Sequence, residues 1–159
     1  MFKASLDKVS KVIPAVMLLF SLVTIVIGLV RETNDFLYLS AFPAMLVLVV
    51  TAGCYVYSPQ GYSVQEDSIL VHRRVGSFSI PRKDIQSLVP LDRKELGRCW
   101  RLAGNGGVFG YTGWFSSSTQ GKMRWFVTRR DRALLIVLHS GRKYLLSPDE
   151  PQAMLDALS

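Results

Sequence analysis

The chain has 159 residues, of which 49% are hydrophobic, and carries a formal net charge of +7. This length leaves room for one globular unit and a small additional segment, which excludes a chain of several full-sized domains. The two cysteines, Cys54 and Cys99, fall in a long apolar segment and in the domain that follows it. We therefore expect no structural disulfide between them, and a reducing compartment suits the chain.

Two long apolar segments lie near the N-terminus. Residues 12–30 and 36–57 contain 19 and 22 residues without a charge. About 20 apolar residues are needed to cross a hydrocarbon core as a helix, and an open strand would leave its backbone polar groups unpaired in lipid. The sequence therefore predicts a two-helix transmembrane hairpin over residues 1–57.

Two other interpretations of these segments were weighed. A signal peptide would end at a small-residue cleavage site, whereas the first segment ends at Arg31-Glu32 and a second apolar segment follows. A buried hairpin of a soluble protein would need a larger body to cover both helices than the remaining residues supply. The transmembrane hairpin is the favoured interpretation.

Basic residues flank the predicted hairpin more densely on one side. The connecting loop, residues 31–35, is so short that the helices must be antiparallel neighbours, with both chain ends on one side. This loop holds only Arg31 as a basic residue. The positive-inside rule therefore predicts that both termini are cytoplasmic. The basic residues on that side are Lys3, Lys8, Lys11, Arg73 and Arg74.

The remaining chain, residues 58–159, has 15 Lys and Arg against 9 Asp and Glu, which accounts for +6 of the net charge. A basic domain tethered at a cytoplasmic surface would be attracted to anionic lipid. The same excess is also what the positive-inside rule and solubility would produce. Charge alone leaves both explanations open.

Alternating apolar and polar residues begin after the breaker cluster at residues 58–61. About seven short strands in roughly 90 residues predict an all-β antiparallel barrel or sandwich. Two tight turns are expected, at Glu66-Asp67 and at His139–Gly141. The candidate strands are residues 62–65, 68–73, 77–80, 85–90, 98–102, 123–128, 133–138 and 142–146.

The chain ends in a predicted helix at residues 148–158. Ser147 suits the N-cap, Pro148 the first helical position, and Glu150 the closing residue of a capping box. An apolar face at helical spacing would plug the opening of the sheet. The residues of that face are Met154, Leu155 and Leu158.

A glycine-rich segment interrupts the strand pattern between residues 104 and 115. A phosphate-binding loop would require a following helix or a Gly-Lys-Ser or Gly-Lys-Thr sequence, and neither occurs. We favour a structural role, in which glycines permit sharp bends and close approach of strands while the aromatic residues pack. The glycines concerned are Gly104, Gly106, Gly107, Gly110 and Gly113.

Three segments carry a family resemblance: residues 106–115, residues 125–128 and residues 146–151. They resemble bacterial membrane-anchored proteins with a pleckstrin-homology-like (PH-like) domain, most densely over residues 98–158. The resemblance implies a curved antiparallel barrel with one C-terminal capping helix, at the bacterial cytoplasmic membrane. It implies little about activity, because this fold hosts several unrelated functions. Thr112 and Phe126 depart from the family pattern, which puts the transfer of a specific site in doubt.

No residue pattern predicts catalysis, a metal or a cofactor. His72 and His139 are the only histidines, and neither has a Cys, Asp or Glu at zinc-like spacing. Nucleophile elbows, Cys-x-x-Cys pairs and zincin motifs do not occur. We therefore predict a non-catalytic protein.

Basic and aromatic residues near residue 124 suggest an interaction surface. Aromatic rings beside Arg suit the headgroup level of a membrane, and the same mixture could stack on single-stranded nucleic acid. Membrane tethering argues against nucleic acid, so we expect a partner protein or anionic lipid. Residues 129–132 are predicted to form an exposed hairpin connection. The candidates are Trp114, Phe115, Arg124, Arg129, Arg130 and Arg132.

Two functional hypotheses follow. In the first, the PH-like domain is an interaction or scaffolding module that holds a protein or anionic lipid at the membrane surface. In the second, the chain is an accessory subunit of a membrane complex, in which the hairpin makes the main contacts and the barrel is regulatory. The small residues proposed for those contacts are Gly28, Ala44, Ala52 and Gly53. The oligomeric state is not predicted.

Overall fold

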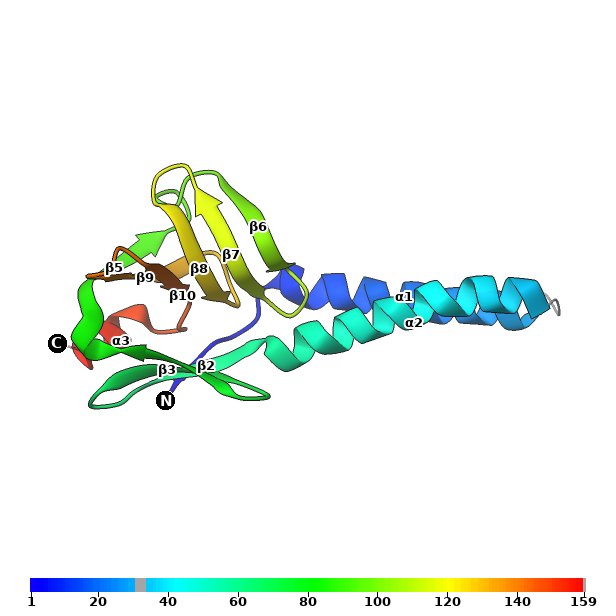
Figure 1. Ribbon diagram of the computed structural model, residues 1–159, viewed down its shortest axis with the longest axis horizontal. Coiled ribbons are helices and arrows are strands. Elements are labelled where there is room, and N and C mark those ends of the chain that lie inside the picture. The colour runs from blue at the N-terminus through cyan, green and yellow to red at the C-terminus, as the bar shows by residue number, and fades with distance from the viewer. Residues whose placement is uncertain (31–33, 159) are drawn as a thin grey trace.

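A computed structural model describes residues 1–30 and 34–158, apart from the side chains of residues 34–38. Two helices, α1 (Lys8–Val30) and α2 (Asn34–Tyr57), run side by side away from a β-rich body (Figure 1). The predicted hairpin of long apolar helices is confirmed. Residues 31–33 of the predicted loop lie outside the described residues. Helix α1 begins earlier than predicted, because the Asp7 carboxylate accepts a 2.7 Å hydrogen bond from the Ser10 amide and caps the first turn.

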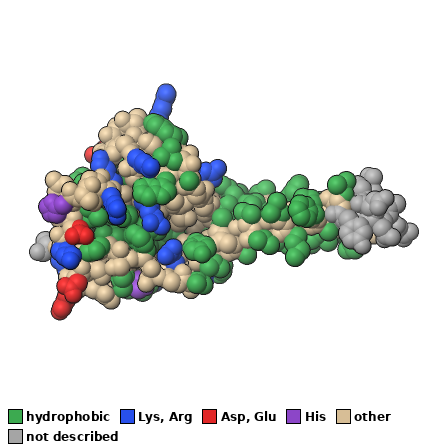
Figure 2. All heavy atoms as spheres, in the orientation of Figure 1, with side chains coloured by type: hydrophobic (Ala, Val, Ile, Leu, Met, Phe, Trp, Pro, Cys, Tyr) green, Lys and Arg blue, Asp and Glu red, His purple; other side chains and the backbone are tan. Residues whose placement is uncertain are grey.

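Both helices are long and apolar enough to cross a membrane. The best windows of Lys8–Val30 and Leu39–Tyr57 have mean hydropathies of 2.7 and 2.0, and 17% of each window is buried. Hydrophobic side chains cover much of the visible face of the pair, while the visible Lys and Arg side chains lie on or beside the β-rich body (Figure 2). The body therefore does not enclose the helices as a soluble core would.

The small residues proposed for contacts with another membrane protein have different positions. Gly28 and Ala44 are buried, Gly53 is half-buried, and Ala52 is exposed. Because the two helices contact each other along their length, Gly28 and Ala44 serve close packing within the hairpin.

The first sheet has four antiparallel strands in the order β1-β2-β3-β4. Strands β2 (Pro59–Val64), β3 (Ser68–Arg73) and β4 (Ser77–Pro81) match the predicted alternation. Strand β1 (Phe2–Lys3) was not predicted, since two residues carry no periodic signal. It pairs with β2 in the register Phe2 to Tyr62. The residues before α1 therefore lie at the same end of the hairpin as the β-rich body (Figure 1).

The second sheet has six strands in the order β5-β9-β10-β8-β7-β6. Strand β10 is antiparallel to β9 but parallel to β8. The sheet also stays open, with β5 at one end and β6 at the other. The predicted fold class of two apolar helices followed by a PH-like β domain is confirmed, and the two sheets form a sandwich and not a closed barrel. The parallel pair of β8 and β10 departs from the predicted antiparallel pattern. The strands are β5 (Ile85–Asp92), β6 (Cys99–Gly106), β7 (Tyr111–Ser117), β8 (Gly121–Val127), β9 (Arg132–Leu138) and β10 (Lys143–Leu146).

The central strands of the second sheet bury both faces. On one face, Phe126, Ile136 and Leu146 pack against the first sheet. On the other face, Trp125 and Leu135 belong to a second core. Burial on both sides explains why residues 133–138 form a continuous apolar run instead of an alternating one.

The C-terminal helix, α3, is shorter than predicted and spans Pro151–Asp156. Glu150 occupies the N-cap position, and neither it nor Ser147 makes a side-chain capping bond. The predicted capping box was therefore wrong, because the Ser147 hydroxyl instead accepts a 2.8 Å hydrogen bond from the Thr128 amide. Met154 is fully buried in the core between the sheets, while Leu155 packs there only partly buried.

Candidate functional site

The turn between β6 and β7 joins the β-rich body to both helices. The Phe109 amide donates to the Ser10 carbonyl of α1 at 3.2 Å. At the end of α2, the Tyr55 ring meets the Phe109 ring at 5.0 Å, and the Ser58 hydroxyl donates to the Phe109 carbonyl. The turn is thereby fixed at the point where the helices leave the body. The surface beside the turn lies at the same end of the helices.

Beside this turn lies a hollow of about 340 Å³, which we call the helix-end hollow. The last turns of α2, the end of β3 and one face of strands β6 to β8 enclose it. Two of its lining residues are arginines, and no Asp or Glu lines it. The lining residues are Gly53, Cys54, Tyr57, Arg73, Gly104, Asn105, Thr112, Gly113, Arg124 and Phe126.

The two arginines of the helix-end hollow have no carboxylate partner among the described residues. The Arg73 Nε atom is buried and lacks a hydrogen-bond acceptor there. The Arg124 guanidinium lies 4.7 Å from the Phe78 ring centroid and 5.1 Å from that of Phe126. A buried, unpaired guanidinium donor is costly, and a phosphate or carboxylate oxygen would satisfy it.

Aromatic and cationic groups also pair where α2 ends. The Arg74 guanidinium lies 3.9 Å from the Tyr55 ring centroid, and the Arg73 guanidinium 5.7 Å from the Tyr57 ring centroid. Tyrosine rings at the end of an apolar helix with arginines over them are typical of the headgroup level of a membrane.

The predicted interaction aromatics differ in exposure. Trp114 is 40% exposed, and the Lys122 ammonium group lies 5.1 Å from its ring. Phe115, however, is buried and stacks on Trp125 at 4.3 Å between ring centroids. Phe115 is therefore a core residue and not a surface contact, because its side chain points to the opposite face of β7 from Trp114.

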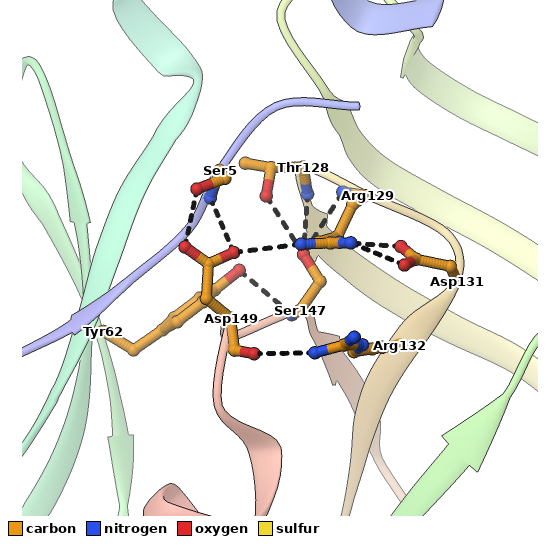
Figure 3. A network of polar contacts seen from close by, with 8 residues as sticks. All are labelled: Ser5, Tyr62, Thr128, Arg129, Asp131, Arg132, Ser147 and Asp149. Carbon is orange, nitrogen blue, oxygen red and sulfur yellow. Dashed lines mark hydrogen bonds and ion pairs between the residues drawn. The ribbon is translucent and has the colours of Figure 1, made fainter. Parts of the chain in front are cut away.

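The predicted hairpin connection at residues 129–132 was also wrong. Strands β8 and β9 are not neighbours, because β10 lies between them. Arg129 pairs with Asp131 at 2.6 Å and with Asp149 at 3.4 Å, so it is not a free surface cation (Figure 3). Its hydrogen bond to Asp131, above all, raises the pKa of Arg129 and lowers the pKa of Asp131.

The other two arginines of this segment also have partners. The Arg130 guanidinium lies 5.3 Å from the Tyr111 ring centroid. Arg132 is exposed and donates to the Asp149 carbonyl at 3.4 Å (Figure 3). Arg129 and Arg132 therefore both contact Asp149, whereas Arg130 lies against Tyr111, so each of the three arginines has a partner within the chain.

Asp149 connects three distant segments in this network. Its carboxylate accepts hydrogen bonds from the Ser5 amide at 3.1 Å and the Ser5 hydroxyl at 2.6 Å, and it also faces Arg129 (Figure 3). Burial raises the pKa of Asp149, but the bonds from Ser5 and Arg129 outweigh it, and the pKa lies below its usual range. Tyr62 adjoins this network through Ser147, whose amide donates to the Tyr62 hydroxyl. Burial raises the pKa of Tyr62 to about 12, so its hydroxyl stays protonated. The hydroxyl donates to the Phe126 carbonyl.

The glycine-rich segment forms the facing ends of β6 and β7. Gly104 and Gly113 have φ angles of +118° and +124°. A Cβ at Gly104 would lie 2.3 Å from the Thr112 carbonyl oxygen, and one at Gly113 would lie 2.3 Å from that of Ala103. The strands thus approach more closely than any side chain would permit. Because both glycines also line the helix-end hollow, this close approach shapes its wall.

No group of three or more His, Cys, Asp or Glu in the described part of the chain could hold a metal ion. His72 shares a 2.7 Å hydrogen bond with the Ser63 hydroxyl of the neighbouring strand. The helix-end hollow itself is lined by two arginines and by no histidine.

Arg73 is the site residue that sequence reasoning missed. From the sequence, Arg73 and Arg74 were counted only among the basic residues that flank the predicted hairpin. Arg73 lies at the end of β3, shortly before Gly76. This position indicated a possible site residue, because strand ends meet at one edge of a sheet.

A two-sheet sandwich with a C-terminal helix packed against it is the architecture of a PH-like domain. The family profile described as bacterial PH domain matches residues 60–159. The chain belongs to this family. No curated protein and no solved structure matches the chain.

Proposed function

We propose that the chain is a membrane-anchored interaction module of a bacterial cytoplasmic membrane, in which α1 and α2 span the bilayer. Membership of the bacterial PH domain family supports a binding role, since PH domains generally bind proteins or lipids. The two apolar helices support the anchor. Strand β1 pairs with β2, so the residues before α1 and those after α2 lie on one side of the bilayer.

The helix-end hollow is the proposed binding site, and its ligand is the phosphate group of an anionic lipid. The main observation that supports this site is that Arg73 and Arg124 line the hollow without a carboxylate partner among the described residues. Helix α2 ends at Tyr57, beside the hollow. A lipid phosphate lies just outside the hydrocarbon core, which is the level at which a helix of this kind ends.

The test uses the full chain in neutral detergent micelles. We would add either short-chain phosphatidylglycerol or short-chain phosphatidylcholine and measure the midpoint of thermal unfolding. A ligand that binds the folded state and not the unfolded state raises this midpoint, by an amount that grows with the logarithm of the ligand concentration above its Kd. We expect phosphatidylglycerol to raise it more than phosphatidylcholine in the wild type, and the variant R73Q/R124Q to lose the difference.

The matched control is Arg142→Gln, which removes an exposed arginine at the turn between β9 and β10. This variant should respond to phosphatidylglycerol as the wild type does. An equal response of wild type and R73Q/R124Q would remove the helix-end hollow from the proposal. Equal responses to the two lipids would exclude an anionic headgroup as the ligand of the hollow.

A further inference from the structure

Strand β6 is an open edge of the second sheet. It lies at the end of the strand order and, among the described strands, pairs only with β7. Residues 100–104 are all exposed. The outer side of β6 therefore carries main-chain N–H and C=O groups that a further strand could pair with.

One face of this edge is strongly basic. Two hollows of about 380 and 300 Å³ meet there, and Cys99 and Trp125 line both. We call this pair of hollows the arginine cleft. No Asp or Glu lines either part. The arginines that line the cleft are Arg93, Arg98, Arg101 and Arg130.

The polar groups of the arginine cleft lack anionic partners. None of its four guanidinium groups forms an ion pair with a described residue. The Tyr111 hydroxyl, which also lines the cleft, lies 3.4 Å from the Asp7 carboxylate. Trp125 is 1% exposed, and its Nε1–H has no acceptor among the described residues. Arginines paired with carboxylates form strong charge-assisted hydrogen bonds, so the cleft fits acidic side chains.

The opposite face of the same edge carries two exposed tryptophans beside the basic side chains of Lys122 and Arg124. Trp100 and Trp114 are 50% and 40% exposed there. Their positions follow from the register, in which Trp100 is opposite Ser116, while Arg101 is opposite the buried Phe115. Trp100 and Arg101 therefore project from opposite faces of β6, ahead of the register shift between Arg101 and Ala103.

We propose that the β6 edge binds an extended segment of a partner protein as an added strand, in which acidic residues alternate with apolar ones. The acidic side chains enter the arginine cleft, and the apolar side chains pack on Trp100 and Trp114. Main-chain pairing supplies affinity and the alternate side chains supply specificity. A second copy of the chain fits poorly, because pairing β6 with β6 would bring Arg98 and Arg101 of both copies together.

This inference goes beyond the headgroup proposal and uses none of its arginines. The test uses the full chain with the substitution Cys54→Ser, which leaves Cys99 in the arginine cleft as the only thiol. The probe is a peptide of alternating Glu and Val residues with blocked ends. The control peptide has the same composition, with its Glu and Val residues in two blocks. Peptide binding is measured by fluorescence anisotropy, and shielding of Cys99 by its alkylation rate.

We expect the alternating peptide to bind and to slow alkylation of Cys99, and the block peptide to do neither. Arg101→Gln, an exposed position, should weaken binding by about fivefold or more. The control Arg142→Gln should leave it unchanged. Equal binding of the two peptides, or equal effects of the two substitutions, would overturn the proposal. Shielding of Cys99 by inorganic phosphate to the same extent would also overturn it, since the cleft would then be a site for small anions.

Discussion

The carboxylate of Asp149 stabilises the fold through charge. It lies between Ser5, near the N-terminus, and Arg129, in the connection that follows β8. Its pKa is lower in the folded chain than the ordinary value of about 4. Its contribution to the free energy of unfolding is therefore complete above that ordinary value and is lost as the pH falls through the folded pKa.

We predict that Asp149→Asn weakens the dependence of the free energy of unfolding on pH in the acidic range. Wild type should lose stability on acidification below about pH 4, and the variant should lose less over the same range, starting from a lower value at neutral pH. Denaturant unfolding of the full chain in micelles at several pH values measures this. Glu66→Gln, at the exposed turn between β2 and β3, should retain the wild-type slope. Parallel profiles for wild type and Asp149→Asn would contradict the prediction.

Among the elements, α3 stabilises the core mainly through the side chain of Met154. Met154 is fully buried between the sheets, whereas Leu155 is only half-buried. Met154→Ala should therefore lower the free energy of unfolding by about 2–5 kcal/mol, and Leu155→Ala by less. Chemical denaturation of both variants gives the comparison, with Gln152→Ala on the exposed side as control. A larger loss for Leu155→Ala would show that α3 is rotated about its axis.

The close pairing of β6 and β7 gives a second test at this scale. Gly113→Ala places a Cβ 2.3 Å from the Ala103 carbonyl oxygen at a φ of +124°, so we expect a loss of about 2 kcal/mol or more. Gly121→Ala is the matched control. It has a φ of +71° with no atom within 4 Å of the added Cβ, and its loss should be smaller. Similar thermal shifts for the two variants would mean that the strands can move apart.

The elements were predicted where one physical signal dominates. The apolar helices and strands β2 to β4 of the first sheet follow from length and alternation, and both are confirmed. The parallel pairing of β10 with β8 could not be predicted, because residues 143–146 carry the same pattern in either direction. The capping box at Ser147 failed for a related reason, since the Thr128 amide lies far away in sequence and competes for the same hydroxyl.

The candidate site was predicted only in part, because tertiary contacts decide which cations are free. Sequence reasoning selected Arg124, which lines the helix-end hollow, but also Arg129, which is neutralised by two carboxylates. A run of arginines gives no indication of which of them will find a partner. Phe115 likewise differs from Trp114 only by the side of the strand from which it projects.

For the whole molecule, the hairpin predicts a topology with both termini in the cytoplasm. A cytoplasmic reporter fused after Ser159 should be active, and the same reporter inserted into the loop at residues 31–35 should be inactive. A periplasmic reporter fused at the two sites provides the reciprocal control. Activity of the periplasmic reporter after Ser159 would reverse the orientation, and with it the proposed location of both binding sites.

The pairing of β1 with β2 imposes an order on biosynthesis. Phe2 and Lys3 leave the ribosome before both apolar helices, and their partner strand β2 follows those helices. The Asp149 amide, which donates to the Lys3 carbonyl at 3.0 Å, emerges later still. Residues 2 and 3 must therefore remain unpaired until both helices and β2 have been translated, and the bond from Asp149 forms later still. In the proposed topology, the hairpin enters the bilayer before the first sheet is complete, so β1 has to stay on the ribosome's side of the bilayer until β2 emerges.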